Sequence, residues 1–334
     1  MEKWRVLLTA RALAEVGRPA LDILREAGCA LISPTRPGTF SAAELISQLE
    51  GIDAILCSPD KFTADVFASP AARSLKIISR WGVGYDSVDI ASASAAGVVV
   101  AFTPGMLNDA VADYAFALMF AIARRIPDGN AALKEGRWSA PWGHDIGNKT
   151  LGIIGCGRIG QAVARRAAGF NMRLLGHDVM PNADAEKLGV KFVPLEELLR
   201  QSDFITLHAA LTPQTQNIIG EPQLRMMKPN AYLINTARGG HIDEAALARA
   251  LTENWIAGAA LDTFVTEPLP KDHPFRSTPN LLLTPHQAGF ARGTGEDVSR
   301  ASAQAIVDLM HGRKPQHVVD AAVFDSPALR AKLN

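Results

Sequence analysis

The chain reads Leu151-Gly152-Ile153-Ile154-Gly155-Cys156-Gly157-Arg158-Ile159-Gly160, an apolar run that ends in the pattern G-x-G-x-x-G. The apolar run predicts a strand, and residues 158–170 predict a helix. In such a strand, turn and helix, the first glycine permits the tight turn, the second lets the backbone approach a pyrophosphate, and the third lets the helix pack closely on the strand. The pattern therefore predicts that a dinucleotide binds at the start of the helix, where unpaired N–H groups favour an anion.

An acidic residue, Asp178, ends the next expected strand. A carboxylate at this position can accept hydrogen bonds from an adenosine ribose and would repel a 2′-phosphate, which favours NAD over NADP as the cofactor. The alternative is that the glycines only make a tight turn and that Asp178 caps a loop. Because strand, helix and acid occur in the right order and spacing, we favour dinucleotide binding.

Apolar runs of strand length alternate with helix-like stretches on both sides of the glycine-rich turn. The alternation predicts an α/β protein with two doubly wound, Rossmann-like parallel sheets, and a length of 334 residues favours two domains. We expect a discontinuous substrate-binding domain at 1–102 and 290–334, an NAD-binding domain at 103–289, and a ligand cleft between them. The expected strands lie at 6–9, 30–33, 54–57, 76–79, 151–155, 172–176, 204–208, 231–235, 256–261 and 281–284, and a last helix from about 294 to 310 is expected to pack on the first domain.

Composition argues against a nucleic-acid-binding, membrane-spanning, disulfide-rich or zinc-binding protein. Lys plus Arg and Asp plus Glu both number 34, so the balanced charge argues against a nucleic-acid surface. The longest apolar run, 114–123, is far shorter than the roughly 20 residues that cross a bilayer, and the N-terminus lacks a signal peptide. Three scattered cysteines suit neither a disulfide framework nor a zinc site, so we expect a cytoplasmic protein without a bound metal.

Three polar residues, Arg238, Glu267 and His286, lie at or just beyond the ends of consecutive expected strands. Strand ends line the ligand crevice of a doubly wound sheet, so these side chains are expected to converge beside the nicotinamide. His286 suits proton transfer to or from a hydroxyl, Glu267 would orient its ring and favour the protonated form, and Arg238 offers a fork of donors for a carboxylate or C2 oxygen. Taken singly, each has a simpler explanation as a surface or loop residue, but their ordered placement favours a catalytic site for hydride transfer to or from a 2-hydroxy acid.

These segments resemble the D-isomer-specific 2-hydroxyacid dehydrogenase family over most of the chain, from Val6 to about Met310. The resemblance implies that Arg238 binds substrate, that Glu267 supports His286, and that His286 is the acid/base. It places cofactor contacts at Arg158, Ile159, Asp178, Thr236, Ala237, Arg238, Asp262 and residues 286–289, the last of which is Gly289. The glycines of the turn, Gly155, Gly157 and Gly160, are expected contacts from the motif itself, and His208, at a strand end, is a further candidate contact.

The resemblance extends to two segments outside the glycine-rich turn. Residues 80–89 are similar to the family's substrate-domain loop, which implies that the backbone amides of Val83 and Gly84 receive the substrate carboxylate. The expected helix at 109–125 looks like the arm through which such enzymes dimerise, so a homodimer is expected.

Within the family, residues 80–89 and 108–127 are most similar to phosphoglycerate-dehydrogenase-type members. Cys57 stands where certain members place an arginine for the substrate phosphate, and the chain stops at Asn334, without the regulatory domain of longer members. Hydroxypyruvate, glyoxylate or another small 2-keto acid is therefore an alternative substrate. Phosphite oxidation and an NAD-sensing, corepressor-like binding protein are more distant alternatives, whereas Glu267 argues against the formate-oxidising branch, which has a glutamine there.

Overall fold

A computed structural model describes residues 3–334 of the chain and divides it into two compact units. The first unit runs up to Leu107 and resumes over Phe290–Asn334, and the second is Asn108–Gly289. Residues 103–107, expected in the second domain, belong to the first unit: the N–H of Thr103 donates to the Gly82 carbonyl (3.0 Å) and Leu107 is buried. No helix in this described part of the chain is both long and apolar enough to span a membrane.

The first unit is built on a five-stranded parallel sheet of order β2-β1-β3-β4-β5. Its strands are fully or largely apolar, as expected where helices cover both faces of a parallel sheet. The short last strand was not expected from the sequence. The strands are β1 (Arg5–Leu8), β2 (Ala30–Ile32), β3 (Ala54–Cys57), β4 (Ile77–Arg80) and β5 (Val99–Ala101).

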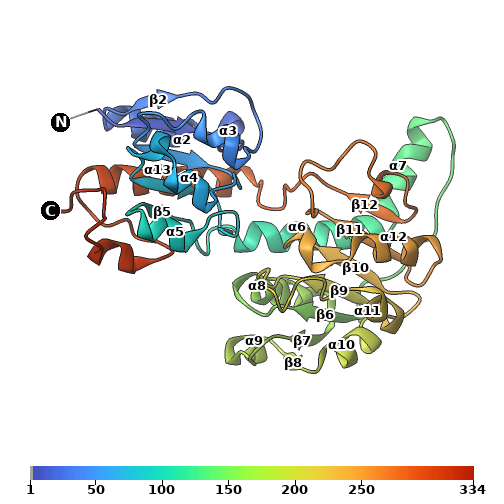
Figure 1. Cartoon of the computed structure of the whole chain (residues 1–334). Coiled ribbons are helices and arrows are strands. Elements are labelled where there is room, and N and C mark those ends of the chain that lie inside the picture. Colours follow the sequence, from blue (N-terminus) through green and yellow to red (C-terminus); the bar gives the residue numbers. More distant parts are fainter. Residues whose placement is uncertain (1–2) are drawn as a thin grey trace. The chain divides into compact units, whose positions relative to one another are not determined.

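The helices of the first unit come from both ends of the chain. The expected C-terminal helix, α13, packs against α2 and β4, so the end of the chain completes the first unit (Figure 1). On the other face, α3, α4 and α5 contribute to one hydrophobic cluster with β1, β3, β4 and β5. The helices are α1 (Leu13–Val16), α2 (Arg18–Glu26), α3 (Ala42–Ile46), α4 (Ala64–Ala68), α5 (Ile90–Ala95) and α13 (Arg292–Met310).

The second unit contains a seven-stranded parallel sheet of order β12-β11-β10-β9-β6-β7-β8. The chain order reverses at β6, which lies between β7 and β9, and this is the point at which doubly wound sheets bind ligands. The short strand β8 was not expected from the sequence. The strands are β6 (Thr150–Ile154), β7 (Arg173–His177), β8 (Val190–Phe192), β9 (Phe204–Leu207), β10 (Tyr232–Asn235), β11 (Gly258–Leu261) and β12 (Leu281–Leu283).

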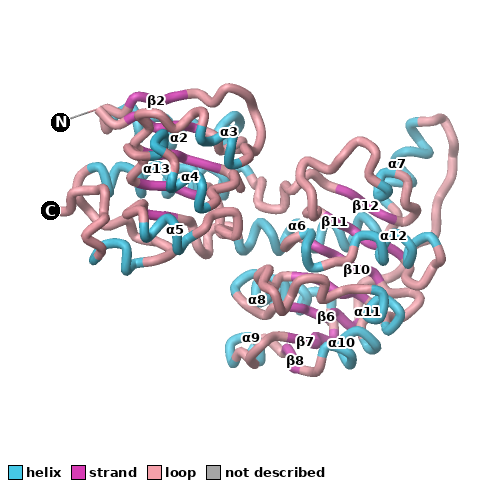
Figure 2. The backbone as a smooth tube through the Cα atoms, viewed as in Figure 1, coloured by secondary structure: helices cyan, strands magenta, loops and turns pink. Residues whose placement is uncertain are grey.

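Helices cover both faces of this second sheet, alternating with the strands along the chain (Figure 2). Successive residues of a strand point to opposite faces, so Phe204 joins the cluster that includes α6 and α8, while Ile205 joins the cluster that includes α10, α11 and α12. The helices are α6 (Asn108–Ala123), α7 (Ile126–Lys134), α8 (Arg158–Ala167), α9 (Ala183–Lys187), α10 (Leu195–Gln201), α11 (Glu221–Met226) and α12 (Glu244–Thr252).

Helix α6 corresponds to the helix expected at 109–125, and it packs against α8, β10 and β11. It ends at Ala123 because Arg125 adopts a left-handed conformation, with φ of 52°. Half of its apolar run, 114–123, is buried inside the second unit, and most of the rest is partly buried. Large exposed apolar side chains occur instead in the segment that follows it, at Ile126, Leu133, Trp138 and Trp142.

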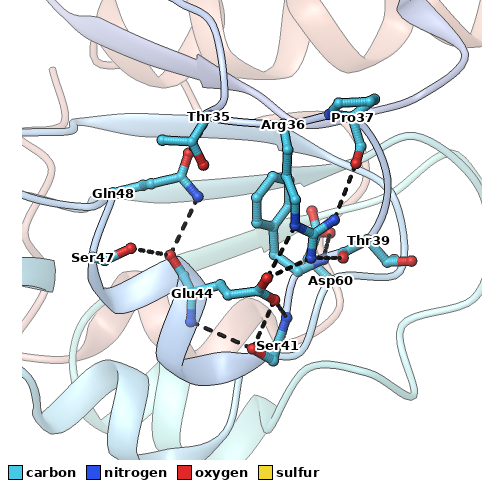
Figure 3. A network of polar contacts seen from close by, with 10 residues as sticks. Thr35, Arg36, Pro37, Thr39, Ser41, Glu44, Ser47, Gln48 and Asp60 are labelled. Atoms are coloured by element: carbon cyan, nitrogen blue, oxygen red, sulfur yellow. Dashed lines mark hydrogen bonds and ion pairs between the residues drawn. The ribbon is translucent and has the colours of Figure 1, made fainter.

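A polar network ties the loop between β2 and α3 to the rest of the first unit (Figure 3). Arg36 pairs with Glu44 (2.7 Å) and donates to the carbonyls of Pro37 and Thr39. Asp60 is fully buried and accepts hydrogen bonds from the hydroxyl of Thr9 and from the N–H of Phe40 (2.8 Å). The network therefore joins an exposed ion pair to a buried carboxylate.

Replacing Asp60 by asparagine is expected to change how stability depends on pH. Burial raises the pKa of Asp60 from 3.8 to about 6, so the folded protein resists ionisation of this group. The contribution of protonated Asp60 to the stability of the folded protein is fully present below pH 4 and is lost as the pH rises through 6. As the pH rises from 4 to 8, the free energy of unfolding of Asp60→Asn should increase by about 3 kcal/mol relative to that of the wild type. Urea unfolding at a series of pH values measures this difference.

The neighbouring Glu44 is the matched control. Hydrogen bonds from the Ser41 N–H and the Arg36 guanidinium lower the pKa of Glu44 to about 2, so its contribution has the opposite sign and is lost as the pH falls. Glu44→Gln should therefore lose stability relative to the wild type at neutral pH. A stability difference for Asp60→Asn that stays constant from pH 4 to pH 8 would contradict the assignment.

Candidate active site

The glycine-rich turn joins β6 to α8, as expected from the sequence. Gly155 has φ of 91°, and a Cβ there would collide with the backbone of Ala209, while a Cβ on Gly160 would collide with the Gly155 carbonyl. Gly157, the residue before α8, faces open space, with no atom within 4 Å of an added Cβ. Packing thus requires glycine at positions 155 and 160. Gly157 leaves room for a ligand at the N-terminus of α8, whose first residues are Arg158 and Ile159.

Asp178 directly follows β7 and accepts hydrogen bonds from the N–H groups of Cys156 (2.7 Å) and Val179 (2.7 Å). The carboxylate therefore does hold the glycine-rich turn, which was the alternative to ribose binding. A carboxylate offers about four acceptor sites, so these two bonds leave capacity for ribose hydroxyls. Asp178 can therefore hold the glycine-rich turn and bind a ribose at the same time.

Buried polar atoms without protein partners follow β9, β10 and β11. Among residues 3–334, Nδ1 of His208, Oγ1 of Thr236 and Oγ1 of Thr263 have no hydrogen-bond partner. Burial lowers the pKa of His208 to about 3, so its ring is neutral, and its Nε2 shares a hydrogen bond with Thr206 (2.8 Å). Unpaired buried polar groups are costly, and these lie at the edge of the sheet where a dinucleotide would bind, so the residues present fit an NAD cofactor.

Arg238 lies beyond the end of β10 in a loop that its neighbours fix tightly. The buried Asn235 side chain donates to the Arg238 carbonyl (2.8 Å) and accepts from the N–H of Ala237 (2.9 Å). A Cβ on Gly239 would collide with the backbone of Phe264, so the loop after β10 touches the loop after β11. This contact connects the backbone at Arg238 to the segment that carries Glu267.

Glu267 and His286 form a hydrogen-bonded pair. The carboxylate can only accept, so Nδ1–H of His286 donates to Oε2 of Glu267 (2.7 Å) and the pair fixes the orientation of the ring. The other oxygen of Glu267 accepts from the N–H of Phe264 (3.0 Å). Both side chains are about one-third exposed, at 34% for His286 and 29% for Glu267, so a small molecule can reach them.

Asp262, expected as a cofactor contact, is fully buried and organises the loop that carries His286. Its carboxylate accepts from the hydroxyl of Thr284 (2.6 Å) and from the N–H groups of Gln287 (3.0 Å) and Ala288 (2.8 Å). Burial raises the pKa of Asp262, and the hydrogen bonds oppose that shift. His286 itself has φ of 51°, and these bonds on both sides of it hold this uncommon conformation.

In the first unit, the loop after β4 contains Val83 and Gly84. Among the described residues, neither of their N–H groups has a protein acceptor. Both residues are partly exposed. Two adjacent unpaired N–H groups can receive one carboxylate.

Comparison with known proteins decides the family. Residues 116–288 match the model described as "D-isomer specific 2-hydroxyacid dehydrogenase, NAD binding domain". A glyoxylate reductase of Korarchaeum cryptofilum is 43% identical over 287 residues, which cover 84% of this chain and 86% of the relative. The chain belongs to the D-isomer specific 2-hydroxyacid dehydrogenase family.

Other relatives and solved structures are similar to this chain over nearly its whole length. A glyoxylate reductase of Thermofilum pendens is 38% identical over 318 residues, which are 92% of this chain and 93% of the relative. Among solved structures, TT0316 protein from Thermus thermophilus has a TM-score of 0.85 at 38% identity over 95% of this chain and 100% of its own. A glyoxylate reductase from Paecilomyes thermophila has a TM-score of 0.81 at 30% identity over 96% of this chain and 99% of its own.

This 2-hydroxyacid dehydrogenase is thus an NAD-dependent oxidoreductase with two parallel-sheet, Rossmann-like units. The relatives quoted above that are named for an activity are glyoxylate reductases, so they favour the small 2-keto acid that the sequence analysis gave as an alternative over phosphoglycerate.

Sequence reasoning missed residues that hold the dehydrogenase's candidate catalytic groups in place. Asn235 ends an otherwise apolar strand, which is a signal that could have singled it out. Thr284 and Gln287 lie beside His286 in sequence, but only the fold shows that both bond to Asp262. Gly289, an expected cofactor contact, is the last residue of the second unit.

Proposed function

We propose that this dehydrogenase reduces glyoxylate, or a 2-keto acid of similar size, to the corresponding 2-hydroxy acid with NADH. The observation that carries the proposal is the hydrogen-bonded pair of Glu267 and His286 at the C-terminal edge of the sheet that carries the glycine-rich turn. The names of the relatives support glyoxylate as the substrate.

Each residue of the proposed site has a separate role in the reaction. When bound, NADH supplies the hydride that reduces the C2 carbon. His286 donates a proton from Nε2 to the C2 oxygen as negative charge develops there, and Glu267 stabilises the protonated ring through Nδ1. Arg238 offers guanidinium donors to the C2 oxygen or to the carboxylate, and the N–H groups of Val83 and Gly84 bind the carboxylate.

The end of β3 favours a substrate without a phosphate. Cys57 is completely buried, and burial raises the pKa of its thiol to about 12. A neutral thiol inside the sheet supplies no positive charge for a phosphate at the position where certain phosphoglycerate-dehydrogenase-type members place an arginine. Phosphoglycerate is therefore the less favoured substrate, and the pair of Glu267 and His286 favours an enzyme over an NAD-sensing binding protein.

Assays with a panel of substrates test the proposal. Purified protein is given glyoxylate, hydroxypyruvate, pyruvate and phosphohydroxypyruvate, each with NADH and with NADPH, and the reverse reaction is tried with phosphite and NAD. We expect the highest kcat/KM with glyoxylate and NADH, since Asp178 disfavours the 2′-phosphate of NADPH. Highest activity with a phosphorylated keto acid or with phosphite would overturn the substrate assignment, and no turnover with any compound would favour the binding protein.

We also propose that the protein is a homodimer. The support is the segment after α6, where Trp138 and Trp142 are 95% and 94% exposed and where Ile126 and Leu133 of the same stretch of chain are also exposed. Several large exposed apolar side chains in one segment are typical of a protein interface. Light scattering at micromolar concentration should give the mass of two chains, and the mass of a single chain would refute the proposal.

A further inference from the structure

The loop after β4 is fixed by hydrogen bonds along its length. The N–H of Trp81 donates to the Cys57 carbonyl (2.9 Å), and the Trp81 indole donates to Ser299 of α13 (2.9 Å). The Gly82 carbonyl accepts from the N–H of Thr103 (3.0 Å), and Gly82 itself has φ of 131°. The loop is thus held rigidly, while the N–H groups of Val83 and Gly84 have no acceptor among the described residues.

Arg80, the last residue of β4, fixes the far end of this loop. Its side chain is buried, and the residue is only 5% exposed. Nε and Nη2 both donate to the Gly84 carbonyl (2.9 and 2.7 Å), and Nη1 donates to the Cys57 carbonyl (3.2 Å). One guanidinium therefore joins the end of β3 to the end of the loop and occupies both lone pairs of the Gly84 carbonyl.

We infer that Arg80 is a positioning residue that holds the backbone amides of Val83 and Gly84 in the orientation that receives the substrate carboxylate. The inference rests on the proposed function of those amides. Arg80 touches the loop from inside the unit and acts through the Gly84 carbonyl rather than through the substrate. Asp60, also fully buried, interacts electrostatically with Arg80 and balances its charge.

The geometry requires a guanidinium. Three N–H groups in one plane reach two carbonyls that belong to different segments, whereas a lysine ammonium is a compact charge on a flexible stem. Lysine at position 80 would keep the charge and hold only part of the loop. The variants Arg80→Lys and Arg80→Gln therefore separate the contribution of the charge from that of the planar fork.

The test compares these variants with a matched arginine of the same unit. Arg330 is half-buried, and its Nη1 also donates to two backbone carbonyls, those of Ala72 (2.5 Å) and Leu75 (3.1 Å), away from the loop after β4. The probe is oxalate, an unreactive carboxylate analogue of a 2-keto acid, titrated calorimetrically into the full-length protein saturated with NADH. Thermal unfolding, the Kd of NADH and steady-state kinetics are measured on every variant.

Arg80→Gln is expected to weaken oxalate binding by about 10- to 100-fold and to raise KM for glyoxylate similarly. The kcat at saturation should stay within about threefold of the wild type, because binding of ground and transition states is lost alike. Arg80→Lys should lie between Arg80→Gln and the wild type. Arg330→Gln should lose comparable thermal stability without any change in oxalate binding, and the Kd of NADH should be constant throughout.

Different results would overturn different claims. If folded Arg80→Gln or Arg80→Lys binds oxalate as tightly as the wild type, the positioning role is refuted. The same holds if Arg330→Gln weakens oxalate binding as much as Arg80→Gln, since the effect would then be general destabilisation of the unit. If the wild-type protein binds neither oxalate nor glyoxylate, the proposed function itself fails, and this inference fails with it.

Discussion

Replacing His286 by asparagine is expected to lower kcat for keto acid reduction by about 10²- to 10⁴-fold, the range typical of a lost general acid. Asparagine tolerates the left-handed backbone at position 286, so the loop should keep its shape. It carries no proton that titrates near neutrality, and it is too short to replace the ring between Glu267 and a substrate. Steady-state kinetics give kcat, and quenching of protein fluorescence gives the Kd of NADH, which should change by less than about threefold.

Two further variants control this experiment. Glu267→Gln keeps an acceptor for Nδ1 but removes the negative charge, so its loss of kcat should be smaller than that of His286→Asn. His273 also lies beside a carboxylate of the same unit, with its Nε2 3.3 Å from Glu244, but it is not one of the proposed catalytic residues. His273→Asn should leave kcat unchanged. Turnover by His286→Asn above about one-tenth of the wild-type rate is incompatible with an acid role at that position.

Replacing Arg238 by lysine is expected to lower kcat/KM by about 10²- to 10³-fold, the size of effect seen when a preorganised donor to a developing charge is lost. Lysine keeps the charge but loses the planar fork that can bind two oxygens together. The loop should stay intact, because Asn235 holds it through backbone atoms at positions 237 and 238. The measurement is kcat/KM with glyoxylate at saturating NADH.

The matched substitution is Arg225→Lys, on an exposed ion pair with Glu221 (2.9 Å) of helix α11. It should leave kcat/KM unchanged. If Arg238→Lys were as active as Arg225→Lys, Arg238 would have no direct role in catalysis.

Much of the fold could be predicted from sequence because its determinants are local. The order of apolar strands and helices around Gly155 follows from hydrophobic periodicity, and the requirement for glycine at positions 155 and 160 follows from steric contacts with the backbone. The pairing of Glu267 with His286 was also expected, because parallel strands bring their carboxyl ends to one edge. The structure places these two side chains 2.7 Å apart.

The parts that sequence reasoning missed depend on contacts between distant segments. Strands β5 and β8 have three residues each and are defined by their pairing with β4 and β7. The bonds from Asp262 reach residues more than 20 positions away, and Arg80 reaches Cys57 across the sheet. Neither partner can be identified from the sequence around the residue itself, since only the register of neighbouring strands brings them together.

The contact between Gly239 and Phe264 has a consequence for how such an enzyme can diversify. Backbone touches backbone there, so the loop that presents Arg238 and the loop that presents Glu267 cannot drift apart independently. A library that randomises the residues after β10 while keeping those after β11 should yield few active clones. Co-randomising both loops with glycine kept at position 239 should yield more, because new substrate preferences at this edge must arise from paired rather than single changes.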